Sequence, residues 1–150
     1  MRKINIIHVG NIKSQEKYFQ DIIDEYTKRL SAEFKITNIE IKEEAGENAG
    51  KEGKKILEKV GDKTNSFKIA LCIEGKKLSS EQFAKLLYNQ MKPVDFIIGG
   101  PAGLSGEVKK SADYLLSLSD MTFSHRMARV MLAEQLYRAY SIETGRKYHK

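Results

Sequence analysis

Apolar residues recur along the chain with two different spacings. Where they alternate with polar residues or form short runs rich in Ile, Val and Phe, the pattern is typical of β-strands. Where they recur every three or four residues, the pattern is typical of amphipathic helices. Strands are predicted at residues 4–9, 34–41, 66–75 and 95–100. Helices are predicted at residues 14–30, 51–60, 79–91 and 124–142, and residues 105–119 are expected to hold one more short helix and one more short strand.

Two serines are candidate caps for these helices. Ser14 stands where the first helix is predicted to begin, and Ser79 stands at the start of the helix at 79–91. Serine is a favoured N-cap because its hydroxyl accepts a hydrogen bond from a backbone N–H of the first turn. Glu81 then places an acidic side chain in the first turn, which the helix dipole favours.

The order of the elements predicts the fold class. Strands that alternate with helices indicate an α/β protein, a three-layer sandwich around a mostly parallel sheet. No repeat and no linker interrupts the pattern, so residues 1–150 are expected to form a single domain.

The composition is that of an ordinary folded domain. The chain has 150 residues, of which 41% are hydrophobic and 31% are charged, unlike a disordered protein. Its apolar runs are too short to span a bilayer, and the N-terminal residues read as a strand and not as a signal peptide. Cys72 is the only cysteine, which excludes an internal disulfide and a cysteine metal cluster. We therefore expect a cytoplasmic protein with no membrane partner and no metal.

Positive charge is concentrated near the C-terminus. The net charge is +6, and residues 121–150 contain six Lys and Arg against two Glu, a net charge of +4. A basic C-terminal segment favours a polyanionic partner, and nucleic acid is the one we expect. The remaining lysines are interpreted as a solvated surface.

Glycines follow the strand predicted at 95–100. Gly99, Gly100 and Gly103 allow close approach of another group or a positive φ, and Pro101 stiffens the turn. In parallel sheets, ligands bind beyond the carboxyl ends of the strands, where residues 99–106 are expected together with the loops after 66–75 and at 117–125. Neither a GxxxxGK[ST] nor a GxGxxG pattern is present, so the ligand need not be a nucleotide phosphate. The glycines are equally compatible with a simple turn of the chain.

The last predicted helix is apolar on more sides than one sheet can cover. One side carries Val130 and Ala133 with Tyr137 and Tyr140, a second carries Met127 and Met131, and a third carries Leu132 and Leu136. A second burial surface is therefore expected, most simply that of a homodimer.

Several long segments resemble one known family. They are IGGPAGLS at 98–105, LSLSDMTFSHRMARVMLAEQLYRAYSI at 116–142, the terminal YHK, INIIHVGNIK at 4–13 and ALCIEGKKLSSEQFA at 70–84. Together they resemble the bacterial SPOUT-class methyltransferases that modify pseudouridine in 23S rRNA. The resemblance covers essentially the whole chain, and its C-terminal part is long and specific.

The resemblance implies more than the spacing of residues indicates. It implies a C-terminal trefoil knot, a homodimer and a bent S-adenosylmethionine bound within the knot. The implied activity is transfer of the methyl group of S-adenosylmethionine to N3 of a pseudouridine in a stem-loop of 23S rRNA, within the assembled ribosome.

The resemblance also implies site residues. The expected contacts of S-adenosylmethionine are Leu71, Gly99, Leu118, Ser119, Asp120, Met121, Thr122 and Phe123. Gly99 and Gly100 would let the cofactor lie against bare backbone, and Leu71 and Leu118 would hold the two faces of the adenine.

The reaction itself requires removal of a proton from an imide nitrogen. His125 or His149 is the candidate base, and Arg129 and Tyr148 are candidates for orienting the substrate or stabilising its anion. His125 is equally well placed to cap the last helix together with Ser124. The expected phosphate contacts are Arg126, Arg138, Arg146 and Lys147. His8 is interpreted as a structural strand residue, and Cys72 as a small buried hydrophobic residue.

Three other functions share parts of this pattern. A non-catalytic RNA- or ribosome-binding module would use the same basic tail but would not need glycines at strand ends. A nucleotide-binding α/β protein of another class is disfavoured by the missing phosphate-loop pattern. A SPOUT methyltransferase that acts on another RNA, such as tRNA, remains open.

Overall fold

Five parallel strands form one sheet at the centre of the molecule. The computed structural model describes residues 1–60 and 65–150, and in these residues the strand order is β2-β1-β4-β3-β5. Every pair of neighbouring strands is parallel. The strands are β1 (Arg2–Val9), β2 (Phe34–Ile41), β3 (Phe67–Lys77), β4 (Val94–Ile98) and β5 (Tyr114–Ser117). The mostly parallel sheet that the sequence predicts is therefore confirmed.

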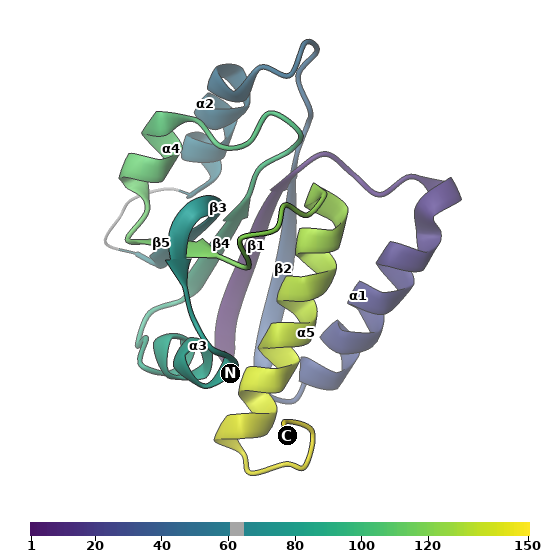
Figure 1. Ribbon diagram of the computed structural model, residues 1–150, viewed down its shortest axis with the longest axis vertical. Coiled ribbons are helices and arrows are strands. Elements are labelled where there is room, and N and C mark those ends of the chain that lie inside the picture. The colour runs from purple at the N-terminus through teal and green to yellow at the C-terminus, as the bar shows by residue number, and fades with distance from the viewer. Residues whose placement is uncertain (61–64) are drawn as a thin grey trace.

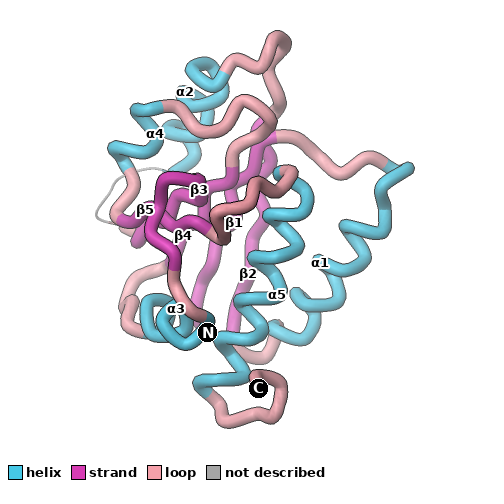
Figure 2. Tube along the Cα trace, viewed as in Figure 1, coloured by secondary structure: helices cyan, strands magenta, loops and turns pink. Residues whose placement is uncertain are grey.

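Helices cover both faces of this sheet. They are α1 (Lys17–Leu30), α2 (Ala49–Val60), α3 (Ser80–Tyr88), α4 (Gly106–Ser111) and α5 (His125–Glu143), and a 3-10 turn, η1 (Ser14–Glu16), precedes α1. α1, α3 and α5 lie on one face, and α2 and α4 lie on the other (Figures 1 and 2). The predicted three-layer α/β sandwich is confirmed.

β4 is buried on both faces and separates two apolar layers. Phe96 and Ile98 pack towards α3 and α5, and Ile97 packs towards α2 and α4. A central parallel strand needs apolar residues on both faces, because helices exclude water from both. The edge strand β2 instead exposes Lys35 and Thr37, as its alternating pattern predicts.

One of the two predicted serine caps is wrong. Ser79 caps α3, since its Oγ accepts a hydrogen bond from the Gln82 N–H at 3.1 Å while the Gln82 side chain accepts one from the Ser79 N–H at 2.9 Å. Ser14 does not cap α1, because the chain enters this helix through η1, and Glu16 occupies the N-cap position without a side-chain hydrogen bond. α3 also ends at Tyr88 and not at residue 91, since the approach to Pro93 disfavours helical backbone.

α5 is enclosed by neighbours from its own chain. Val130 and Ala133 pack with Ile23 of α1, while Leu132 and Leu136 pack in the layer between α5, α3 and the sheet. The sheet alone does not cover this helix, as predicted. Because α1 and α3 supply the additional cover, the apolar character of α5 does not by itself require a second copy of the chain.

A register shift in β3 shapes the carboxyl end of the sheet. Both Leu71 and Lys76 pair with Leu116 of β5, so the intervening residues bulge out of the ladder. Gly75 lies against β5 so closely that a Cβ there would be 2.6 Å from a backbone carbon of Leu116. The bulge therefore holds residues 72–75 above the ends of β4 and β5, where the pocket described next is found.

Candidate functional site

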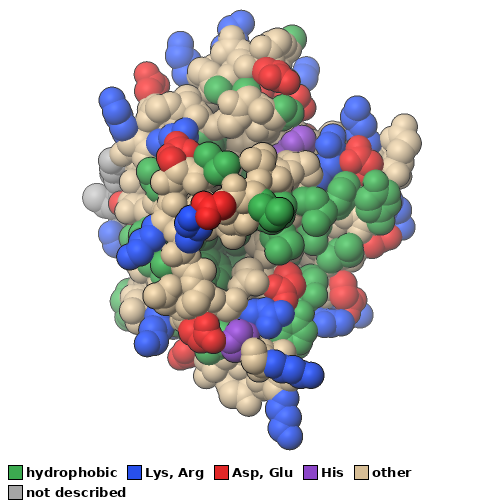
Figure 3. Space-filling model, in the orientation of Figure 1, with side chains coloured by type: hydrophobic (Ala, Val, Ile, Leu, Met, Phe, Trp, Pro, Cys, Tyr) green, Lys and Arg blue, Asp and Glu red, His purple; other side chains and the backbone are tan. Residues whose placement is uncertain are grey.

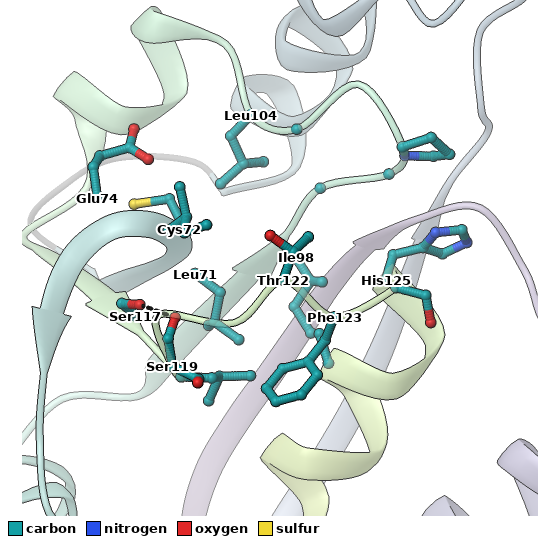
Figure 4. A pocket seen from close by; sticks show the side chains of 18 of the residues that line it. Leu71, Cys72, Glu74, Ile98, Leu104, Ser117, Ser119, Thr122, Phe123 and His125 are labelled. Carbon is teal, nitrogen blue, oxygen red and sulfur yellow. Dashed lines mark hydrogen bonds between the residues drawn. The ribbon is translucent and has the colours of Figure 1, made fainter.

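A pocket of about 680 Å³ lies beyond the carboxyl ends of β3, β4 and β5 (Figure 4). Its volume falls within the range of about 300–1,000 Å³ that is usual for small-molecule sites. The walls come from the end of β3, the glycine-rich loop after β4 and the segment between β5 and α5. The second and third are loops that the sequence places beyond strand ends, whereas the first, residues 71–74, belongs to the strand predicted at 66–75 and not to the loop expected after it.

Most residues predicted to contact a cofactor line this pocket. They are Leu71, Gly99, Leu118, Ser119, Met121, Thr122 and Phe123. Asp120 does not line it, because its side chain is 84% exposed and forms an ion pair with Lys77. The direction of this one side chain could not be inferred from its place in the motif.

The glycines after β4 first serve to fold their own loop. A Cβ on Gly99 would lie 2.8 Å from the carbonyl carbon of Gly103, and a Cβ on Gly100 would lie 2.9 Å from Val9. The Gly103 N–H donates to the Gly100 carbonyl at 2.9 Å, and Gly103 has a φ of +75°. The chain itself therefore approaches the bare backbone of Gly99, as the alternative of a turn requires, and Gly99 also lines the pocket, as the predicted cofactor contact requires.

Local hydrogen bonds hold the segment between β5 and α5. The Ser117 Oγ donates to the Ser119 carbonyl at 2.9 Å, and the Ser119 Oγ accepts from the Met121 N–H at 3.0 Å (Figure 4). The Ser124 Oγ caps α5 by accepting from the Met127 N–H at 3.3 Å. Each of these serine hydroxyls is thus bonded to a backbone group nearby in the chain, and Leu118 and Phe123 line the pocket wall with apolar side chains.

His125 begins α5 at the edge of the pocket. Its Nε2 is buried and, within the described residues, has no hydrogen-bond partner. A Cβ on Gly10 would lie 3.6 Å from this Nε2 and 3.5 Å from the Glu43 carboxylate, so all three groups meet at the end of β1. Burial and the neighbouring Arg126 lower the pKa of His125, and Glu43 opposes this shift. The imidazole is therefore neutral at neutral pH and able to accept a proton.

Arg129 and His8 lie behind the first turn of α5. Arg129 is buried, and in the part of the chain that the structure describes its guanidinium makes no hydrogen bond and no ion pair, while burial lowers its pKa. Burial, together with the charge of Arg129, lowers the pKa of His8 to about 4. The His8 Nδ1 is 2.9 Å from the Gly10 carbonyl, to which it donates. This arrangement fits the interpretation of His8 as a structural residue.

The predicted catalytic residues of the tail do not reach this pocket. The Tyr148 hydroxyl donates to Glu134 at 3.0 Å, near the middle of α5. The His149 Nδ1 lies 3.2 Å from Arg138 and therefore accepts, and the opposite Nε2 lies 2.7 Å from Glu81 of α3. Figure 1 shows the C-terminus at the end of the molecule opposite the start of α5.

The predicted phosphate contacts also divide into two groups. Arg126 lines the pocket and pairs with Glu16 at 3.1 Å. Arg138 pairs with Glu134, Arg146 donates to the Tyr140 hydroxyl at 2.9 Å, and Lys147 is exposed near the tail. All four belong to one basic segment of the sequence, but the length of α5 separates Arg126 from the other three.

Some pocket residues were not identified from the sequence. They include Cys72, Glu74, Pro101, Leu104 and Lys109. Pro101 and Leu104 belong to the glycine-rich loop, which was the available signal. Cys72 is only partly buried, so it is not the buried core residue that was expected, and desolvation raises the pKa of its thiol. Glu74 and Lys109 meet only because α4 packs beside β3, which no local pattern indicates.

Residues 1–60 and 65–150 lack two kinds of feature. No group of three or more His, Cys, Asp or Glu side chains is arranged to hold a metal ion there. Over the same residues, no helix is both long enough and apolar enough to cross a membrane.

Comparison with known proteins gives one consistent result. The model of the family described as "Predicted SPOUT methyltransferase" matches residues 2–149. The chain is 50% identical to the "Ribosomal RNA large subunit methyltransferase H" of Clostridioides difficile (strain 630), over 98% of this chain and 99% of that one. It is 49% identical to the protein of the same name from Caldicellulosiruptor bescii, with the same coverage, and 45% identical to that of Streptococcus thermophilus, over 99% of each chain.

A solved structure supports the fold. The structure of a probable methylase family protein from Haemophilus influenzae Rd KW20 matches with a TM-score of 0.58 and 11% sequence identity. The match covers 99% of this chain and 70% of that one. At this identity the likeness concerns the architecture alone.

Replacing His8 with Gln is expected to flatten the dependence of stability on acid pH. The pKa of His8 is about 4 in the folded chain against an ordinary value of 6.5, so the unfolded chain binds the proton first as the pH falls. The contribution of this residue is complete above about pH 6.5 and falls by roughly 3 kcal/mol as the pH approaches 4. Urea unfolding of both proteins across this range measures the difference. Parallel curves for the free energy of unfolding against pH would contradict it.

Proposed function

The chain belongs to the SPOUT methyltransferase family, and we propose that it transfers a methyl group from S-adenosylmethionine to N3 of a pseudouridine in 23S rRNA within the assembled ribosome. The observation that carries this proposal is the pocket at the carboxyl ends of β3, β4 and β5, which is lined by every residue of the segment 118–123 except Asp120, the segment that the family resemblance assigns to the cofactor. The names of the similar proteins support ribosomal RNA of the large subunit as the substrate. Membership of the family also implies a C-terminal knot.

The lining of the pocket fits an adenine-bearing cofactor. Leu71 and Leu118 line the pocket with apolar surface for the faces of a ring, and the backbone of the lining residues Thr122 and Phe123 would supply hydrogen-bond partners for its edge. The bound cofactor would supply a methyl group on a positively charged sulfur, which is a good leaving group. The protein's own contribution is then to align the acceptor nitrogen with this methyl group and to exclude water.

The acceptor nitrogen must lose a proton as its bond to the methyl carbon forms and the bond from carbon to sulfur breaks. His125 is at the pocket edge, is neutral at neutral pH and is one candidate to receive this proton. His149 is the other candidate. Arg129, one helical turn after His125, is buried but does not line the pocket, so its positive charge would act on the developing imide anion only from behind the pocket wall.

A homodimer would bring the tail to a pocket. Within one chain, Tyr148 and His149 are held far from the pocket, so these residues would reach it only if a second copy packed with its tail beside this pocket. Exposed apolar side chains support such an interface: Tyr18 and Ile22 on α1 are 58% and 42% exposed, and Met121 is 74% exposed. Figure 3 shows apolar surface gathered over α1 and the start of α5.

The basic residues near the tail would position the RNA. Arg138, Arg146 and Lys147 lie at the C-terminal end of α5 and are proposed to contact phosphates, which orient a protein on RNA without reading its sequence. Because assembled ribosomes are the proposed substrate, we place the protein in the cytoplasm.

The first test is incorporation of labelled methyl from S-adenosylmethionine into ribosomes that lack the modification, with free 23S rRNA and tRNA in parallel. We expect label in the ribosomes, mapped by mass spectrometry to one pseudouridine. Label in tRNA alone would redirect the assignment to another RNA. Cofactor binding without transfer to any of these RNAs would support the non-catalytic binding module instead.

Gly99→Val is expected to weaken binding of S-adenosylmethionine by more than about tenfold, or about 1.4 kcal/mol. Any Cβ at this position meets the backbone of Gly103, so the loop must open and deform the pocket wall. Isothermal titration calorimetry measures the affinity. Gly106→Ala is the matched control, because a Cβ there has nothing within 4 Å and Gly106 does not line the pocket. Normal affinity of the Val variant would remove this loop from the site.

His149→Ala is expected to lower kcat on ribosomes by roughly 100-fold if this residue accepts the proton, with cofactor affinity nearly unchanged. Cofactor affinity should be spared because His149 lies outside the pocket of its own chain. Lys150→Ala, one residue further along the tail, is the control for a general effect of altering the terminus. Unchanged turnover would leave His125 as the remaining candidate base.

A further inference from the structure

Three ion pairs involve residues that line the pocket or adjoin its lining in the chain. Each joins a cation to a carboxylate from a different part of the chain: Lys109 with Glu74, Lys77 with Asp120, and Arg126 with Glu16. Glu74, Lys109 and Arg126 line the pocket directly. Asp120 lies between two lining residues, Ser119 and Met121. The pairs therefore connect β3 to α4, the end of β3 to the segment before α5, and the start of α5 to η1.

These pairs are accessible to solvent to different degrees. The side chains of Lys77 and Asp120 are 54% and 84% exposed, whereas those of Arg126 and Glu16 are 22% and 26% exposed. Exposed ion pairs contribute little to stability, since water and salt screen them. A stronger anionic partner would therefore displace the carboxylates readily, at least from Lys77.

RNA provides such a partner at this place. A nucleotide whose base reaches the methyl group at this pocket would carry phosphates on both sides, and these would lie near the pocket mouth. Phosphate oxygens form strong charge-assisted hydrogen bonds with Lys and Arg. In the free protein, however, each of the three cations is already neutralised by its own carboxylate, so an approaching phosphate meets attraction and repulsion together.

We propose that Lys77, Lys109 and Arg126 form a phosphate-binding rim for the substrate RNA, and that Asp120, Glu74 and Glu16 hold this rim in a self-neutralised state which the phosphates displace. This inference rests on the proposed function, since it requires that an RNA base enters the pocket. It assigns RNA contacts to Lys77 and Lys109, outside the basic C-terminal segment. It also explains why the Asp120 side chain points out of the pocket.

Self-neutralisation of the rim would favour the correct RNA over others. An RNA that only touches the rim must displace the carboxylates without placing a base in the pocket. The correct RNA makes the same exchange and also gains the contacts of its base. A repulsive element of this kind raises specificity while it lowers affinity. Removing a single carboxylate should therefore tighten RNA binding, the opposite of what loss of a supporting ion pair would do.

α1 carries a matched control. Glu25 and Arg29 form an ion pair at 3.0 Å within that helix, with side chains 55% and 45% exposed, and neither lines the pocket. Glu25→Gln removes the same charge as Glu74→Gln or Glu16→Gln but does so away from the rim.

The test is binding of these variants to ribosomes that lack the modification, in a salt series and at saturating S-adenosylhomocysteine, so that differences in cofactor affinity and turnover do not enter. Asp120→Asn, Glu74→Gln and Glu16→Gln should each bind about threefold to tenfold more tightly than the wild type at low salt, and Glu25→Gln should bind like the wild type. Lys77→Met and Lys109→Met should bind more weakly and reduce the salt slope by roughly 0.7 to 0.9 each.

Two results would overturn the proposal. Weaker or unchanged binding by the three rim carboxylate variants would show that the pairs serve only to hold the pocket together. An equal gain for Glu25→Gln would show that only the overall charge matters. Either result would leave the proposed function intact, provided that the wild type methylates these ribosomes. A wild type that neither binds nor methylates them would overturn both.

Discussion

The parallel pairing of β3 with β4 on one side and β5 on the other is the constraint on which the site depends. Because the three strands run in the same direction, the segments that leave them meet at one edge of the sheet. The register shift in β3 then raises residues 72–75 over this edge, and Gly75 permits it because no Cβ separates it from β5. Without this pairing, the three lining segments would lie on separate parts of the surface.

α5 connects the pocket to the rest of the molecule. It begins at the pocket with the Ser124 cap, and its first turn covers His8 and the buried Arg129. Along its length it packs against α1, α3 and the sheet, and at its far end the tail folds back onto Glu134 and Glu81. A rigid helix of 19 residues thereby keeps the tail away from the pocket of the same chain.

The cationic side chains near the two ends of α5 differ in how far carboxylates neutralise them. At the pocket, the cations Lys77, Lys109 and Arg126 are matched by carboxylates, so the rim is close to neutral. Near the tail, Arg146 and Lys147 are exposed, and the helix that precedes them carries few acidic side chains. Long-range attraction of RNA would then come from the tail, and recognition at close range from the rim.

The sequence by itself determined the alternation of strands and helices, the parallel sheet and two of the three segments that form the pocket, because these follow from local periodicity and from the direction of parallel strands. The sequence also identified the family, because its long motifs can be recognised without a structure. Tertiary structure alone decided the direction of the Asp120 side chain, the meeting of Glu74 with Lys109, the burial of Arg129 and the distance between the tail and the pocket. Each of these depends on how elements far apart in the sequence pack together, and the failed prediction for Ser14 has the same origin, since a 3-10 turn replaced the expected helix start. Local patterns report which residues form an element, but only packing fixes what each side chain meets.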